Sequence, residues 1–314
     1  MKTGVLLDEA CLRHQPGAGH PERASRLEAI RNQFAKDGVF DEITRIEPRM
    51  AKDEELLLIH TPDYVRTVLR DVESGLPILS TGDTNIGGPD SIEAARHAAG
   101  GVLNAVDEVC TGKLSNAFCA VRPPGHHATP DRGMGFCLFN NIAIAARYAQ
   151  KKHGLGRVAI VDWDVHHGNG TQDAFYEDGE VFFFSSHQSP WYPGTGRRAE
   201  TGSGKGLGAT MNRPFPAGSA MKEIGGAFEN DLVPALTRFK PELLLISAGF
   251  DSRAGDPLGG FLLTDDDFAA LTRILKMVAA TSARNRIVSI LEGGYNIRGL
   301  ASAVSAHLAA LREK

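Results

Sequence analysis

Short apolar runs alternate along the chain with longer amphipathic segments. Seven runs have the length and composition of strands: 4–8, 116–121, 157–163, 180–186, 209–215, 242–248 and 286–292. Helical patterns lie between or after them, at about 19–36, 53–74, 92–109, 138–152, 219–237, 264–283 and 299–312. Strands that alternate with helices predict an α/β fold, with right-handed crossovers and a mostly parallel central sheet covered by helices on both faces.

A long glycine- and proline-rich loop, residues 75–91, interrupts the helical patterns of the first third of the chain. Loops of this length inside a compact domain are often functional, and Asp83 lies in the middle of this one. The alternative is that Asp83 only organises the turn through a local side-chain hydrogen bond.

The HPER segment, which we expect to be a polar loop leading into the first predicted helix, is a second polar feature. His20, Glu22 and Arg23 could all face a site from this entry. A surface or helix-capping role explains Arg23 equally well.

Polar side chains follow four of the predicted strands at their carboxyl ends. They are His126 and His127 after 116–121, Asp164 and His166 after 157–163, Asp251 after 242–248, and Tyr295 after 286–292. Ligands of open parallel sheets bind beyond this edge, where residues distant in sequence meet. This convergence is stronger evidence for a site than any single motif.

The segment 157–169, RVAIVDWDVHHGN, carries metal-ligand side chains at every second position. The alternation of Asp162, Asp164 and His166 places them on one side of an extended chain. Unpaired buried charge is strongly unfavourable, so a cation is expected there. Asp164, His166 and Asp251 together offer two oxygens and one nitrogen and leave a fourth position for water, which is typical of catalytic zinc.

The other strand-end residues provide groups for hydrolysis of an amide or ester by metal-activated water. In the His126–His127 pair, one ring could move a proton while the other stabilises charge, and Asp162 could orient an imidazole. Tyr295 could donate to a developing oxyanion. Each motif alone is better explained by a packed histidine pair, a loop network or a turn. Together, at one sheet edge, the motifs favour a hydrolytic site.

Composition excludes some classes of function. Of the residues, 42% are hydrophobic and 23% are charged, and the net charge is -4, so no positive field gathers nucleic acid or an anionic membrane. No apolar run has the length of a membrane span, the N-terminal segment does not resemble a signal peptide, and the four cysteines lack CxxC spacing. We therefore expect a cytoplasmic protein with reduced thiols, and residues 1–314 as one domain.

Eight motifs resemble the histone deacetylase and acetylpolyamine amidohydrolase family, which has the arginase-like α/β fold, and especially its class II and bacterial members. They are HPERASR (20–26), RPPGHHA (122–128), GFCLFNN (135–141), VDWDVHHGNGTQ (161–172), YPGTG (192–196), SAGFD (247–251), DPLGG (256–260) and LEGGYN (291–296).

The resemblance implies one zinc ion on Asp164, His166 and Asp251. It implies that His127 is the general base and acid, that His126 is its electrostatic partner held by Asp162, and that Tyr295 polarises the acyl carbonyl. It also implies a structural potassium ion; its ligands would be Asp162, Asp164, His166, Ser185 and Ser186.

The resemblance also implies a narrow tunnel for an acylated alkylamine, with substrate-binding residues along its wall and around it. The tunnel residues are Gly135, Phe136, Tyr192 and Leu258, with Asp83 at the rim and Arg23 near an internal acetate-release cavity. Asn169 replaces the aspartate that class I relatives pair with the second histidine, and Leu258 replaces the glutamate of a polyamine-selective relative.

The expected function is removal of acetyl or small acyl groups from acylated lysine side chains. Deacetylation of acetylpolyamines or other small acetylated amines is the alternative within this class, and a catalytically weak acyl-lysine binding module is the alternative outside it. The expected partners are these substrates, without nucleic acid or membrane; an oligomer is left open.

Overall fold

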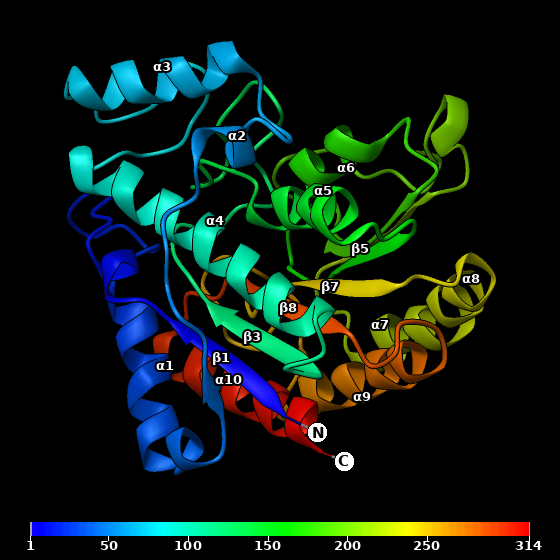
Figure 1. Ribbon diagram of the computed structural model, residues 1–314. Helices are drawn as coiled ribbons and strands as arrows, with labels where there is room; N and C mark the ends of the chain where they lie inside the picture. Colours follow the sequence, from blue (N-terminus) through cyan, green and yellow to red (C-terminus); the bar gives the residue numbers. More distant parts are fainter. Residues whose placement is uncertain (1, 314) are drawn as a thin grey trace.

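A parallel β-sheet runs through the centre of the molecule (Figure 1). The computed structural model describes residues 2–313, in which eight strands follow the order β2-β1-β3-β8-β7-β4-β5-β6. Their bounds are β1 (Thr3–Leu7), β2 (Thr44–Arg45), β3 (Asn116–Ala120), β4 (Val158–Asp162), β5 (Val181–Gln188), β6 (Thr210–Phe215), β7 (Leu243–Ala248) and β8 (Ile287–Leu291). All neighbouring pairs are parallel, so the predicted fold class is confirmed.

The central strands are buried along their whole length, which explains their nearly continuous apolar composition. Their register places Asp162 of β4 beside Ser185 of β5 and Ser247 of β7. Ser247 in turn pairs with Ile290 near the end of β8. The carboxyl ends of these strands therefore lie at one level, where their following loops meet.

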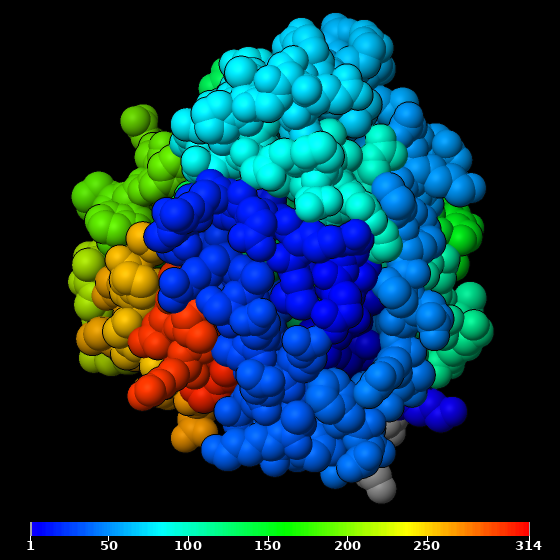
Figure 2. Space-filling model, turned by 90° about the vertical axis from the view of Figure 1, so that its left-hand side faces the viewer, coloured from blue at the N-terminus to red at the C-terminus, as the bar shows by residue number. Residues whose placement is uncertain are grey.

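Helices cover both faces of the sheet (Figure 1). Helices α4 (Pro89–Cys110) and α5 (Asn141–His153) pack on one face, with α2 (Asp53–Leu56), α3 (Pro62–Glu73) and α6 (Asn169–Phe175) on the same side. Helices α1 (Ser25–Lys36), α9 (Asp265–Ser282) and α10 (Ile297–Arg312) pack on the other, near α7 (Met221–Ala227) and α8 (Val233–Phe239). Figure 2 shows the side of the molecule where the N-terminal segments in blue lie beside the cyan segment around α3.

The structure differs from the sequence-based expectation at several boundaries. Helix α1 begins at Ser25, later than the helical pattern that starts at residue 19, and the HPER segment is a loop as predicted. The two-residue strand β2 and the helix α6 were not predicted, because each is too short to show a repeating pattern of hydrophobic positions. The helix expected at 219–237 contains a π-turn, Phe228–Leu232, between α7 and α8. Among the described residues, every helix is too short or too polar to span a lipid bilayer.

Candidate active site

The two histidines predicted after β3 lie buried beneath the carboxyl edge of the sheet. Their ring centroids are 4.1 Å apart. Nδ1 of His126 lies 2.9 Å from Oδ2 of Asp162, and Nδ1 of His127 lies 2.7 Å from Oδ1 of Asn169. Gly125, which precedes the pair, packs so closely on α5 that a Cβ there would lie 2.5 Å from the backbone nitrogen of Asn141. Only glycine fits this approach, which sets the course of the histidine loop.

The hydrogen bonds of Asn169 fix the tautomer of neutral His127. Nδ2 of Asn169 donates to the backbone carbonyl of His127 at 3.3 Å, and this leaves Oδ1 of Asn169 as an acceptor. Nδ1 of His127 must then carry the proton that Oδ1 accepts. The free lone pair of the ring is on Nε2, which is the nitrogen that can take a proton from a reactant.

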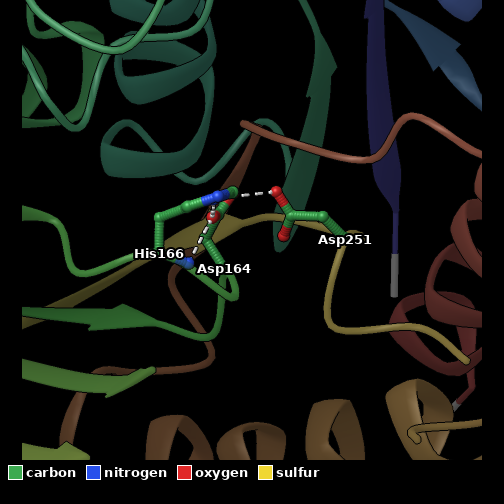
Figure 3. Close-up of side chains that lie close together, drawn as sticks. All are labelled: Asp164, His166 and Asp251. Carbon is green, nitrogen blue, oxygen red and sulfur yellow. Dashed lines mark hydrogen bonds and ion pairs between the residues drawn. The ribbon is translucent and has the colours of Figure 1, made fainter. Parts of the chain in front are cut away.

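Asp164, His166 and Asp251 converge as predicted (Figure 3). One ligand atom from each lies within 4.8 Å of the others. Nδ1 of His166 is 3.0 Å from Oδ1 of Asp164 and 3.2 Å from Oδ2 of Asp251. Apart from this ion-pair contact with His166, Oδ2 of Asp251 is buried and makes no hydrogen bond in the described residues. Such an orphaned carboxylate oxygen beside a second carboxylate and an imidazole fits a divalent metal ion.

Two glycines leave the space that these carboxylates fill. A Cβ on Gly249 would lie 2.1 Å from Oδ2 of Asp164, and one on Gly293 would lie 1.9 Å from Oδ2 of Asp251. The backbone N–H of Gly293 also donates to Oδ2 of Asp164 at 2.8 Å. The glycines of the SAGFD and LEGGYN motifs are thus needed for close approach to the acidic cluster.

The electrostatics of the cluster divide the two histidines. Burial alone would lower the pKa of His126, but the carboxylates of Asp162 and Asp164 raise it to about 10. Burial, followed by the positive charges of His126 and His166, holds the pKa of His127 well below its usual range. His127 is therefore the neutral ring and His126 the cationic one.

The acids also differ. Burial and the charge of Asp164 raise the pKa of Asp251 to about 7, and burial raises that of Asp162 to about 6. Although burial alone would raise the pKa of Asp164, His126 and His166 hold it far below the usual value. A buried cluster with this excess of acids gains from an additional cation.

Tyr295 reaches the site from the loop after β8. Its backbone N–H donates to Oδ2 of Asp256 at 2.7 Å, and its ring lies 6.0 Å from that of Phe136. Gly294, with φ of 122°, makes the sharp turn that precedes it. Burial raises the pKa of the Tyr295 hydroxyl well above its usual value, so the group remains a proton donor.

A cavity of about 280 Å³ leads to these groups. It is lined by Asp83, His127, Gly135, Phe136, His166, Trp191, Tyr192, Leu258 and Tyr295. At its mouth, Oδ1 of Asp83 accepts from the Gly135 N–H and Oδ2 accepts from the Tyr192 hydroxyl, each at 2.9 Å. Asp83 thus joins two loops of the cavity wall. Trp191, which the sequence did not single out, donates its indole N–H to the Leu258 carbonyl at 2.8 Å.

The arginine behind the site is Arg26, and the expectation for Arg23 requires correction. Arg23 is exposed. The guanidinium of Arg26 is fully buried, lies 5.0 Å from the centroid of the Tyr295 ring, and donates to the Gly294 carbonyl at 2.7 Å. The sequence misled because the choice between two arginines three positions apart depends on where α1 begins.

Some of the predicted potassium ligands lie on neighbouring strands of the sheet. Ser185 and Ser186 lie on β5, where Ser185 pairs with Asp162 of β4, and Oγ of Ser185 is 2.9 Å from Nδ1 of His187. Oδ1 of Asp162 accepts from the Asp164 N–H at 3.0 Å, and Oγ of Ser186 is buried without a partner in the described residues. The presence of an ion there stays a prediction.

Comparisons with known proteins agree with this geometry. The histone deacetylase domain family matches residues 20–311. A probable deacetylase of Archaeoglobus fulgidus is 40% identical over 95% of this chain and 83% of its own length. The human polyamine deacetylase HDAC10 is 41% identical over 90% of this chain and 43% of its own length. The crystal structure of the HDA15 HD domain matches with a TM-score of 0.92 and 39% identity, covering 99% of this chain and 89% of that one.

Proposed function

The chain belongs to the histone deacetylase family, and we propose that it is a zinc-dependent amidohydrolase that removes acetyl or small acyl groups from acylated lysine side chains. The observation that carries the proposal is the convergence of Asp164, His166 and Asp251 next to a neutral and a cationic histidine. This membership confirms the resemblance seen in the motifs, and the relatives compared above are named as deacetylases.

Asp164, His166 and Asp251 would hold the zinc ion. When bound, zinc would supply Lewis-acid activation of the water and of the acyl carbonyl. The orphaned Oδ2 of Asp251 supports this ligand set, since a bound cation would satisfy it.

The neutral ring of His127 acts as general base through Nε2, because Nδ1 carries the proton shared with Asn169. Nε2 takes the proton from water and later returns it to the leaving amine. His126, held cationic by Asp162, stabilises negative charge as the tetrahedral centre forms. The Tyr295 hydroxyl donates a hydrogen bond to the oxyanion.

The cavity accounts for the proposed substrate. Its aromatic walls, Phe136 and Tyr192, suit the apolar stem of an acylated alkylamine, and Asp83 stands at the mouth, where the rest of the substrate would lie. Leu258 provides an apolar rim position next to Trp191. Arg26, rather than Arg23, would contact the far end of the site beneath Tyr295.

A second candidate is deacetylation of acetylpolyamines or other small acetylated amines. It is favoured by the mouth of the cavity, where Gly135 and Tyr192 already donate to both oxygens of Asp83, and by similarity to a human polyamine deacetylase. A peptide backbone would have to share the Asp83 carboxylate with these donors.

The proposal includes three further features. Residues 1–314 form one catalytic domain, a structural potassium ion binds beside Ser185, and the protein acts in the cytoplasm without nucleic acid or membrane partners. The net charge of -4 supports the expectation that the protein binds neither nucleic acid nor an anionic membrane.

Turnover after removal and return of metal tests the proposal. The chain should hydrolyse acetyl-lysine peptides, lose this activity on treatment with a chelator, and regain it with about one equivalent of zinc. Asp251→Asn should lower zinc stoichiometry and turnover, whereas the surface control Asp231→Asn should change neither. An inert zinc-loaded protein would contradict the enzyme and favour a binding module; faster turnover of acetylspermidine-type amines than of peptides would favour the second candidate.

A further inference from the structure

Glu292 is a buried acid that has no part in the mechanism described above. It follows the last residue of β8, and its side chain is fully buried. Oε2 accepts the backbone N–H of Gly125 at 2.7 Å and that of His126 at 3.2 Å, while Oε1 accepts the Ser247 hydroxyl at 3.1 Å. A single carboxylate therefore joins the loops or ends of three strands, β3, β7 and β8.

The contacts with Gly125 and His126, and the backbone that follows Glu292, lead to reacting groups. Gly125 and His126 form the backbone that carries the histidine pair. On the other side, the chain continues from Glu292 through two glycines to Tyr295, and the Glu292 carbonyl accepts from Nη2 of Arg26 at 2.5 Å. The base and the oxyanion donor thus come from separate loops, and Glu292 is a point at which these loops are tied together.

The hydrogen bonds of the Glu292 carboxylate hold the two loops firmly, because neither loop has another acceptor for these N–H groups among the hydrogen bonds described above. Buried backbone N–H groups require acceptors, and those of Gly125 and His126 both point to the same oxygen. The fully buried glutamate would be costly to keep unless its hydrogen bonds were made. Truncation of the side chain would leave both amides without this acceptor and free the histidine loop to move.

We propose that Glu292 is a positioning residue that fixes the His126–His127 loop relative to Tyr295. This rests on the proposed hydrolytic function for its effect on rate, but not for its effect on the loop. The property required is the acceptor geometry of the side chain; its charge is not required, since an amide oxygen in place of Oε2 could accept both N–H groups while the amide nitrogen donates to Ser247.

Two substitutions separate acceptor geometry from the presence of any side chain. Glu292→Ala should lower kcat about 100-fold with KM within about threefold, because a misplaced base affects the reacting geometry more than the binding of the stem. Glu292→Gln should stay within about tenfold of the unmodified kcat. If the alanine variant does not fold, Glu292→Asp, which is one methylene too short to reach both amides, should show the same loss.

Ser289→Ala is the matched control on the same strand. Ser289 is fully buried and bonds to His307 at 2.8 Å, away from the reacting groups, so this variant should lower stability without lowering kcat. An unchanged kcat in Glu292→Ala, an equal loss in Ser289→Ala, or a loss in Glu292→Gln as large as in Glu292→Ala would each overturn the proposal.

Hydrogen exchange separates a failure of this proposal from a failure of the proposed function. The amides of Gly125 and His126 should exchange at least tenfold faster in Glu292→Ala than in the unmodified protein or in Glu292→Gln, whether or not the protein turns over any substrate. Equal exchange in all three would overturn the positioning role. A protein with the expected exchange pattern but no zinc-dependent turnover would retain the positioning role and refute only the hydrolytic function.

Discussion

Replacing Asn169 by aspartate places a negative charge beside the proposed general base. In the present structure His127 shares its Nδ1 proton with a neutral amide oxygen at 2.7 Å, and burial together with the cationic His126 holds its pKa well below the usual range. A carboxylate at the same position would stabilise the protonated ring. Since His127 must be neutral to accept a proton, the substitution should move the acid limb of the kcat/KM profile to higher pH.

The size of this movement follows from the contact distance. With about 4 Å between the charge centres and an effective dielectric constant of about 20, the attraction is about 4 kcal/mol. The cost of burying the new carboxylate opposes it, so we expect the limb to move by about one to two pH units. On the acid side of the limb, kcat/KM should therefore fall about 10- to 100-fold.

Initial rates on an acetyl-lysine peptide, measured with zinc-loaded protein between about pH 5.5 and pH 9, test this expectation. Asn169→Ala is the control, because it removes the acceptor without adding charge. This variant should reduce kcat without moving the acid limb of the kcat/KM profile to higher pH. A limb that stays in place or moves to lower pH in Asn169→Asp would refute the assignment of His127 as base, as would equal movement in both variants.

Three further substitutions probe other parts of the structure. Tyr295→Phe keeps the packed ring but removes the oxyanion donor, so kcat should fall about 10²- to 10³-fold while the Kd of a hydroxamate measured by calorimetry changes little. Glu22→Gln should lower the free energy of unfolding in urea by about 3 kcal/mol at pH 7. Although burial alone would raise the pKa of Glu22, the Arg122 guanidinium lowers it from 4.5 to about 2. The difference in unfolding free energy between this variant and the unmodified protein should therefore be complete above pH 4.5 and shrink towards pH 2. Tyr192→Phe frees one oxygen of Asp83, so turnover of peptides should rise relative to that of small acetylated amines, and an unchanged ratio would exclude competition at the mouth.

The sequence predicts the parts of this protein that depend on local pattern. The apolar runs predict the central strands, and the rule that parallel strands end at one edge predicts that Asp164, His166 and Asp251 lie together, as they do. Strand β2 and helix α6 escaped prediction because a two-residue strand and a seven-residue helix are too short to show a period. Arg26 escaped prediction because the choice between Arg23 and Arg26 depends on where α1 begins.

The supporting carboxylates could not be found from pattern for a different reason. Glu292 accepts from Gly125, 167 positions earlier, and Glu22 pairs with Arg122, 100 positions later. No periodicity links such partners, and each acid alone reads as an ordinary charged residue. Yet these contacts hold the loops on which the proposed base and oxyanion donor lie, whereas the cavity walls that bind the stem rest on other loops. Substitutions in this buried layer should therefore lower kcat more than they raise KM, while substitutions at Asp83 or Tyr192 should act mainly on substrate choice.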